Sequence, residues 1–349
     1  MQRYPKLYFG ILILLLVGTI IMAIDFGAVP IHIHEMYSAL LHAIKNDAPL
    51  NIHEAVFLEI RLPRVLLCAI TGGILAASGV MMQGLFRNPI VEPGLIGTSA
   101  GAAFGASFIF VLSDILPFWL QRFSGILLVP VFAFVGSVLA TVLVYTLAKS
   151  VNRVSVTNLL LIGIAVNAIA LSGTGFLSFI SRDPQARSIT FWNLGSFAGA
   201  SWLQILITAI VTLPVMILLL RYANQLNALM LGDKEAGYLG VHTERLKWQI
   251  LLLNTAMVAI ATAFVGVIAF VGLIVPHMMR LLIGGNNRTL LPAAFLSGAI
   301  LLTVADIAAR LLIAPGEIPI GIITSLVGAP VFIILLKQTQ LLQKGGSYD

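Results

Sequence analysis

The chain is organised as long apolar runs separated by shorter polar connections. A membrane-spanning helix needs about 20 mostly apolar residues, and ten runs are candidates for such helices. Their approximate bounds are 7–24, 63–84, 94–112, 126–148, 156–179, 198–220, 248–268, 271–283, 291–313 and 319–337. The eighth run is too short to span comfortably unless it is broken or tilted. The pattern predicts an all-α polytopic membrane protein with ten transmembrane helices.

The composition supports a membrane protein rather than a soluble one. Hydrophobic residues make up 59% of the 349 residues and charged residues only 10%, whereas a soluble domain carries roughly 25% charged residues. This excludes a soluble enzyme, a nucleic-acid-binding protein and a disordered scaffold. No segment outside the ten runs is able to bury a soluble core, so we expect residues 1–349 to form a single transmembrane domain. The first run lacks a small-x-small cleavage site and is interpreted as a retained span.

The distribution of basic residues predicts the orientation. With the N-terminus inside, 13 of the 20 Lys and Arg residues fall on the cytoplasmic side, and the positive-inside rule then places both termini in the cytoplasm. The seven basic residues expected outside are Lys45, Arg61, Arg64, Arg122, Arg182, Arg187 and Arg310.

Ionisable residues are almost absent from the runs. Asp306 is the exception, and we expect it to form a structural i,i+4 pair with Arg310 near the outer face rather than a proton relay. Because ion-coupled carriers normally keep a titratable group near the midplane, the energy for uphill transport is expected to come from elsewhere. The polar residues left at depth suit either a weakly interacting passage or interhelical hydrogen bonds. They are Gln83, Asn167, Ser172, Thr174 and Asn254.

Small residues recur at helical spacing in the second and third runs. Gly97, Gly101 and Gly105 are four residues apart, and Gly72 begins a similar series in the second run. Such residues let helix backbones approach closely. We interpret them as internal packing surfaces rather than as a dimerisation motif. The only cysteine, Cys68, lies in an apolar run and is expected to be a small buried hydrophobe.

A long polar connection, residues 221–247, is the candidate docking segment. The chain has no G-x-x-x-x-G-K-[ST] phosphate loop and does not hydrolyse ATP by that chemistry. The connection reads as short helices punctuated by Gly232 and Gly240, with Asp233 and Glu235 near a helix start, where carboxylates complement the helix dipole. It is either a docking element for a soluble partner or a solvated loop. No catalytic constellation and no metal site are expected.

On the opposite side, Arg61-Leu62-Pro63-Arg64 begins the second run, and proline is expected in the first turn of a helix. The two arginines either extend to the membrane interface or present guanidinium groups to carboxylates of another protein.

Five segments together resemble the FecCD-type permease subunits of bacterial ATP-binding-cassette importers for haem, iron-siderophore complexes and cobalamin. The resemblance covers the chain from about residue 55 onward, and the first 55 residues match poorly. The segments are Arg-Leu-Pro-Arg (61–64), Ser-Gly-Val-Met-Met-Gln-Gly-Leu-Phe-Arg-Asn-Pro-Ile-Val-Glu-Pro-Gly-Leu-Ile-Gly (78–97), Leu-Gly-Asp-Lys-Glu-Ala-Gly-Tyr-Leu-Gly-Val (231–241), Phe-Val-Gly-Leu-Ile-Val-Pro-His-Met-Met-Arg (270–280) and Glu-Ile-Pro-Ile-Gly-Ile-Ile-Thr-Ser-Leu-Val-Gly-Ala-Pro-Val-Phe (317–332).

The resemblance implies a non-enzymatic transport subunit of the bacterial inner membrane. Members have ten spans, form a homodimer around a central path and pair with two ATP-binding subunits, while a soluble substrate-binding protein delivers the ligand from outside. No cofactor is expected to stay bound, because ATP and Mg belong to the partner ATPase. No nucleic acid is involved.

Site residues follow from the same resemblance. Arg61, Arg64 and Arg310 would dock the binding protein, and we expect replacement of Arg61 and Arg64 by Glu to weaken docking while leaving folding intact. Spans 2, 5, 8 and 10 would line the path, with Gln83, Asn167 and Phe176 as candidate lining residues. A segment near 226–247 would couple to the ATPase through Gly232, Asp233, Glu235, Ala236, Leu239 and Gly240.

The ligand is best assigned as haem, with a ferric siderophore and then cobalamin as alternatives. The segment 191–202, rich in aromatic residues, looks most similar to haem-importing members. Imidazole is a common iron ligand, but the outer-loop histidines His32, His34, His42 and His53 are interpreted as incidental, and His277 as a structural residue at a turn. A secondary transporter or a channel without an ATPase, and a non-transporting scaffold, are the alternatives from other classes.

Overall fold

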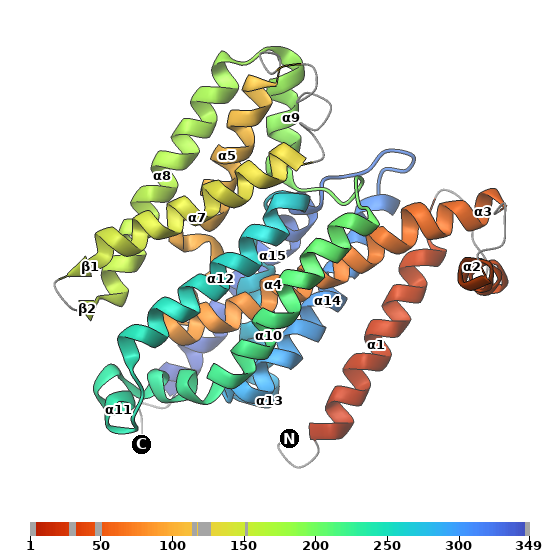
Figure 1. Ribbon diagram of the computed structural model, residues 1–349. Coiled ribbons are helices and arrows are strands. Elements are labelled where there is room, and N and C mark those ends of the chain that lie inside the picture. The colour runs from red at the N-terminus through yellow and green to blue at the C-terminus, as the bar shows by residue number, and fades with distance from the viewer. Residues whose placement is uncertain are drawn as a thin grey trace.

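The computed structural model describes residues 5–27, 33–45, 51–113, 117, 127–150 and 153–345. Within these residues the fold is helical apart from a two-residue antiparallel ribbon that pairs Lys149 with Val154 (Figure 1). Its strands are β1 (Lys149–Ser150) and β2 (Arg153–Val154). The helices are α1 (Pro5–Asp25), α2 (Ile33–Lys45), α3 (Ile52–Ala55), η1 (Val56–Arg61), α4 (Leu62–Phe86), η2 (Pro93–Ile96), α5 (Thr98–Leu112), α7 (Val129–Ala148), α8 (Val156–Ile180), α9 (Asp183–Leu194), α10 (Trp202–Leu231), α11 (Asp233–Tyr238), α12 (Thr243–Val265), α13 (Val271–Ile283), α14 (Asn287–Leu311) and α15 (Ile320–Gly345).

The ten predicted runs coincide with ten of these helices, which confirms the predicted fold class. Seven described helical segments are long and apolar enough to cross a membrane, and α5, α13 and the Ile320–Leu335 part of α15 are shorter apolar helices. The 13 residues of α13 match the run that was expected to be too short for a simple span. The ten helices are α1, α4, α5, α7, α8, α10, α12, α13, α14 and α15.

Three polar or amphipathic stretches differ from the sequence prediction. The sixth span was expected to end near residue 220, but α10 continues through Arg221 to Leu231 because no glycine or proline lies between Arg221 and Gly232. The connection predicted over 221–247 is therefore mostly helix, and only 232–242 separates α10 from α12. Two further helices, α2 and α9, were not predicted, since neither is a long apolar run.

Helix α4 forms the centre of the molecule. Its span is 89% buried inside the chain, and it packs against α14, α13, α10 and α12. A Cβ atom added to Gly72 would lie 2.2 Å from the carbonyl oxygen of Gly298 in α14, and one added to Gly101 in α5 would lie 2.4 Å from that of Gly136 in α7. The small residues therefore serve internal helix packing, as predicted. Cys68 is buried in the same core.

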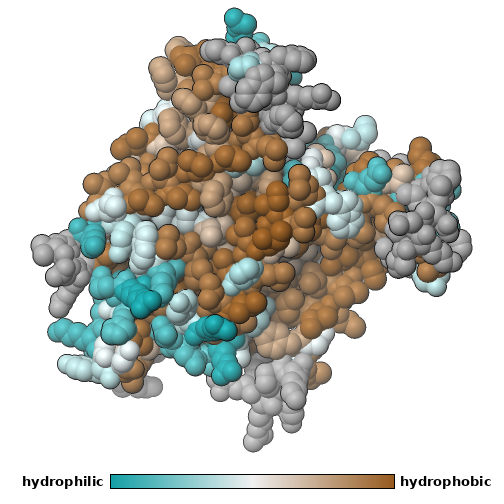
Figure 2. Space-filling view, viewed as in Figure 1, coloured by the Kyte–Doolittle hydropathy of each residue, from teal (hydrophilic) through white to brown (hydrophobic). Residues whose placement is uncertain are grey.

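The two ends of the bundle carry different elements. Figure 1 places α11 and α13 toward the bottom of the view, whereas α9 lies at the top and α2 and α3 at the right. Apolar side chains cover most of the surface in Figure 2, and hydrophilic residues gather toward the end that contains α11. This distribution is that of a helical bundle with a lipid-facing belt and polar ends.

Candidate functional site

At the start of α4, Arg64 lies between two carboxylates from distant parts of the chain. Its Nη2 donates to Asp306 Oδ1 at 2.9 Å, and its Nη1 donates to Glu317 Oε1 at 2.7 Å. The Asp306 side chain is only 2% exposed and that of Glu317 is 41% exposed. Arg64 therefore has one buried partner and one partner within reach of solvent.

Arg61 and Arg310 hold the end of α1 against this cluster. Arg61 donates to the carbonyl oxygens of Ile24 and Asp25, while Arg310 donates to those of Ala23, at 2.8 Å, and Phe26, at 2.9 Å. Cations at a helix C-terminus satisfy the last carbonyl groups and complement the helix dipole. The predicted i,i+4 pair is present, with 3.1 Å between Arg310 Nε and Asp306 Oδ2.

The structure thus brings the three predicted docking arginines together, but their guanidinium groups are engaged inside the chain. Arg61 and Arg64 are only 6% and 8% exposed, which fits neither free interfacial arginines nor open docking groups. A carboxylate introduced at Arg64 would face buried Asp306, and like charges in a desolvated site are costly. The expectation that both arginines tolerate replacement by Glu without a folding cost is therefore corrected. Their docking role stays a prediction. We refer to Arg61, Arg64, Asp306, Arg310 and Glu317 as the outer arginine cluster.

At the opposite end of the bundle, the predicted coupling segment forms a separate short helix. Gly232 has φ +143° just before α11, and Gly240 has φ +81° just after it, so the predicted glycine punctuation is confirmed. Ala236 is fully buried, which anchors one side of the helix. Leu239 is 64% exposed and Tyr238 is 88% exposed. Tyr238 was not among the predicted coupling residues, although an aromatic residue two positions before a helix-ending glycine is a visible signal.

A buried lysine ties α11 to the rest of the bundle. The Lys247 side chain in α12 is 1% exposed, and its Nζ donates to Asp233 Oδ2 at 2.7 Å and to Glu244 Oε1 at 2.9 Å. Its third partner is the carbonyl oxygen of Val154 at 3.1 Å. Asp233 also pairs with Arg87, the left-handed C-cap residue of α4. We call Arg87, Asp233, Glu244 and Lys247 the α11 charge node, because it joins α11 to both α4 and α12.

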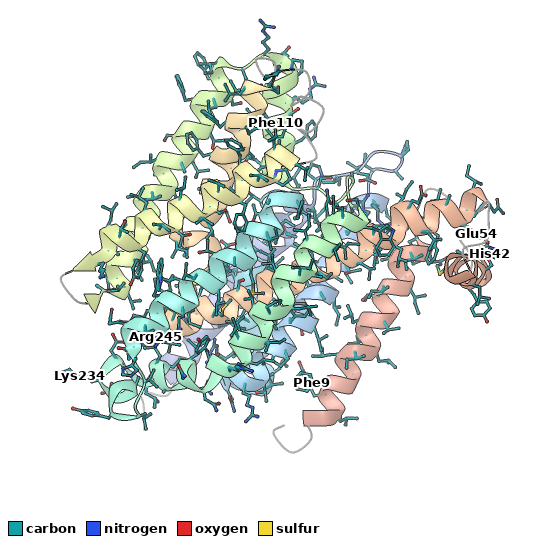
Figure 3. The ribbon with its side chains drawn as sticks, in the orientation of Figure 1. Phe9, His42, Glu54, Phe110, Lys234 and Arg245 are labelled. Atoms are coloured by element: carbon teal, nitrogen blue, oxygen red, sulfur yellow. The ribbon has the colours of Figure 1, made fainter. Side chains whose placement is uncertain are left out.

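Sequence reasoning assigned Asp233 to the coupling segment, but it did not find the residues that hold this carboxylate. Arg87 lies within one of the recognised segments, and Lys247 marked only the end of a polar connection. Arg87 carried no local pairing signal, since 146 residues separate it from Asp233, whereas the i,i+3 spacing of Glu244 and Lys247 was a visible one. Glu235 and Lys234 are exposed on α11, and Figure 3 shows Lys234 and Arg245 at this end of the bundle.

The three predicted path residues lie in different environments. Gln83 is buried, and its Nε2 donates to the carbonyl oxygen of Leu273 in α13 at 3.1 Å. Asn167 lines a cavity of about 390 Å³, together with Glu92, Asn193 and other residues. Its Nδ2 donates to the carbonyl oxygen of Leu95 at 3.1 Å, whereas its buried Oδ1 has no partner among the described residues.

Phe176 is 62% exposed on α8 and does not line that cavity. The structure therefore does not bring the three residues into one lining, and their path role stays a prediction. Of the other polar residues at depth, Asn254 is buried and Thr174 lines the same cavity as Asn167.

Two histidines of the segment before α4, His42 and His53, pair with carboxylates. His42 Nδ1 lies 3.2 Å from Glu54 Oε2, and His53 Nδ1 lies 3.6 Å from Glu35 Oε1. Figure 3 shows His42 and Glu54 close together between α2 and α3. His32 falls outside the described residues. Among the described residues, no three His, Cys, Asp or Glu side chains are grouped to hold a metal ion.

Comparisons with known proteins agree with this architecture. A model of the FecCD transport family matches residues 13–338, so the family likeness begins well before residue 55, where it was expected to start. The hemin transport system permease protein HmuU of Yersinia pestis is 42% identical over 337 residues, which cover 96% of this chain and 97% of the relative.

The vitamin B12 import system permease protein BtuC of Vibrio cholerae is 37% identical over 286 residues, which cover 82% of this chain and 84% of that protein. Among solved structures, an inward-facing conformation of a putative metal-chelate type ABC transporter superposes with a TM-score of 0.80 at 34% identity. The match covers 96% of this chain and all of the other.

Proposed function

This chain belongs to the FecCD transport family, and from that membership we propose that it carries haem across the membrane. It is a multi-pass permease subunit of an ATP-binding-cassette importer in the inner membrane. The observation that carries the ligand assignment is the 42% identity to a hemin permease along 96% of the chain. Cobalamin is the second candidate, because a vitamin B12 permease is 37% identical over 82% of the chain.

We propose that the driving energy comes from ATP hydrolysis on a separate subunit. The exposed residues Tyr238 and Leu239 form an apolar ridge on α11, and an exposed aromatic side chain of this kind is a typical anchor at a protein interface. The ATPase would dock on this ridge. Motion of α11 would then reach α4 and α12 through the α11 charge node, because Asp233 contacts Arg87 and Lys247 at once. Rigid-body displacement of packed helices is a common form of switching.

On the outer side, we propose that the soluble binding protein docks on the outer arginine cluster by replacing one of the carboxylates that pair with Arg64. Asp306 is buried and stays with Arg64, whereas Glu317 is 41% exposed and is the partner that a carboxylate of a soluble binding protein would replace. Charge-assisted pairs of this type set register and encounter rate more than affinity.

The remaining assignments follow the same scheme. Two copies of the chain would surround a path that includes Gln83, Asn167 and Phe176, with residues 1–349 as one transmembrane domain and both termini in the cytoplasm. The positive-inside distribution of Lys and Arg supports this orientation. The buried carboxylate of Asp306 is occupied by two arginines, which favours a structural role over the proton relay that a secondary transporter would need.

The test is a comparison of ligand uptake in a reconstituted system. The chain is incorporated into liposomes with its ATP-binding subunit and its soluble binding protein, and uptake of haem, cyanocobalamin and a ferric siderophore is measured with ATP on the ATPase side. We expect haem uptake to exceed uptake of the other two at least tenfold. Equal or greater uptake of cyanocobalamin would transfer the assignment to cobalamin and leave the importer mechanism in place.

A further inference from the structure

An open groove of about 700 Å³ lies between α10 and α14 near the α11 end of the bundle, and neither the proposed transport path nor the α11 ridge includes it. Arg221 and Arg288 supply its charge, and both side chains are exposed. The whole lining is Ile217, Leu220, Arg221, Asn224, Arg288 and Pro292. The lining thus combines two cations, one amide and three apolar residues, without a carboxylate.

Hydrogen bonds fix the two helices that carry these arginines against each other. In α10, Asn227 Oδ1 accepts hydrogen bonds from the backbone nitrogen of Asn287 at 2.9 Å and from its side-chain nitrogen at 2.8 Å. Asn227 Nδ2 donates to Asn286 Oδ1 at 2.9 Å. These bonds fix the first turn of α14, which carries Arg288, against the part of α10 that follows Arg221. The groove is therefore preformed.

Neither arginine has an anionic partner within the described part of the chain. Arg87 at the same end and Arg64 at the other are both paired with carboxylates. Arg288 also lies in the first turn of α14, where a cation opposes the helix dipole. An anion bound between Arg221 and Arg288 would neutralise the two guanidinium groups. It would also offset the unfavourable interaction of Arg288 with the dipole of α14.

An apolar stripe continues from the groove along α10. Leu213, Ile217 and Leu220 are 64%, 56% and 42% exposed, and their spacing of four and three residues places them on one helix face. This stripe belongs to the lipid-facing surface of a transmembrane helix, and it ends at Arg221. The groove therefore offers a site for a phosphate group at the membrane boundary and a surface for an acyl chain below it.

We propose that this groove binds an anionic phospholipid, with the headgroup phosphate on Arg221 and Arg288 and an acyl chain along the exposed face of α10. Basic pockets between transmembrane helices at the cytoplasmic boundary are suited to such headgroups. The bound lipid would bridge α10, which leads into α11, and α14, which carries Asp306. The site is independent of the transported ligand.

The proposal is tested by native mass spectrometry of the full chain, titrated in detergent with dioleoylphosphatidylglycerol or dioleoylphosphatidylcholine. We expect binding of the anionic lipid to be tighter by on the order of tenfold, since each basic side chain near a lipid surface adds appreciable attraction. The preference should disappear in the Arg221→Gln/Arg288→Gln variant and persist in Arg221→Lys/Arg288→Lys. The Arg182→Gln/Arg187→Gln variant removes the same charge from the N-cap and first turns of α9 and should keep the preference.

Asn224→Asp provides a second test that leaves both arginines in place. Asn224 is exposed, so the substitution spares the core, and the added carboxylate should lower the preference for the anionic lipid through repulsion. An undiminished preference in both Asn224→Asp and the double Gln variant would overturn the proposal. Displacement of the lipid by millimolar inorganic phosphate would also overturn it, because the site would then bind a free anion. If the double Gln variant keeps its preference for the anionic lipid but no longer co-purifies with the ATPase, the groove would be assigned to a protein partner instead.

Discussion

Helix α4 has a charge network at each end, and the two networks differ in how far water reaches them. In the outer arginine cluster, the side chains of Arg64, Asp306 and Arg310 are 10%, 2% and 9% exposed. In the α11 charge node, only Lys247 is buried, at 1%, while its partner Asp233 is 40% exposed. Buried pairs are strongly destabilised when one member is removed, whereas half-exposed pairs contribute little to stability.

This difference separates a structural role from a transmitting one. The outer cluster fixes α1, α4 and α14 to one another and has one member within reach of solvent, Glu317, which is 41% exposed. The α11 charge node holds a small external helix through the carboxylates of Asp233 and Glu244, which are 40% and 36% exposed. We therefore expect substitutions in the outer cluster to act mainly on stability and those in the node to act mainly on coupling.

The largest effect is expected for Asp306→Asn. The substitution leaves Arg64 and Arg310 without their shared buried carboxylate, and loss of one partner of a buried ion pair costs about 3–5 kcal/mol. Denaturant unfolding in detergent should show a loss of this order. Asp183→Asn, at an exposed aspartate of α9, is the matched control and should be close to the wild type. If Asp306→Asn and the control had the same unfolding free energy, the cluster would have no structural role.

The second effect concerns Lys247→Met. A methionine fills similar space, but α11 loses its ionic link to α12, and residues along a coupling network change coupling by up to about 2 kcal/mol. Transport per ATP hydrolysed in proteoliposomes should fall by roughly tenfold, while the complex with the ATPase still assembles. Lys337→Met, at an exposed lysine of α15, is the control. Wild-type transport per ATP in Lys247→Met would show that the node does not transmit motion.

The third effect concerns Tyr238→Ala on the exposed ridge of α11. Because Tyr238 is 88% exposed, its removal should leave the thermal unfolding midpoint unchanged. Affinity for the ATPase subunit should fall by on the order of tenfold or more, as at an interface anchor. Surface plasmon resonance with the immobilised permease measures this. Tyr37→Ala, at an exposed tyrosine of α2, is the matched control at the other end; equal affinities for the two variants would place the ATPase interface elsewhere.

The smallest effect is expected for Glu317→Gln. Removal of the exposed partner of Arg64 should strengthen attachment of the soluble binding protein by a factor of about two to five, since an exposed ion pair contributes less than about 1 kcal/mol. Titration calorimetry with the purified binding protein reads the change. Weaker attachment would mean that Glu317 itself contacts the partner, contrary to an exchange at Arg64.

Most of the membrane fold follows from the sequence, because long apolar runs have few alternatives to spanning helices. The end of α10 was placed too early because Arg221 was taken as a boundary, whereas the helix ends at Gly232. Helix α9 was missed because its residues are close to neutral in mean hydropathy, so no apolar run marks it.

The candidate sites were predictable only where the signal is local. The Asp306–Arg310 pair follows from i,i+4 spacing, and Gly232 and Gly240 mark the ends of α11. The partners of Arg64 were not predictable, since Asp306 lies 242 residues away and Glu317 lies 253 residues away. Tertiary packing alone determines that an arginine expected to face a partner is instead engaged within the chain.

The central claim is that this permease has no drive of its own and is moved through α11 by a separate ATPase. Its most direct test is haem uptake into proteoliposomes that contain the permease, with or without the ATPase and with ATP or a non-hydrolysable analogue. We predict uptake only when the ATPase and hydrolysable ATP are both present. Uptake by the permease alone, driven by an imposed proton or sodium gradient, would contradict the account.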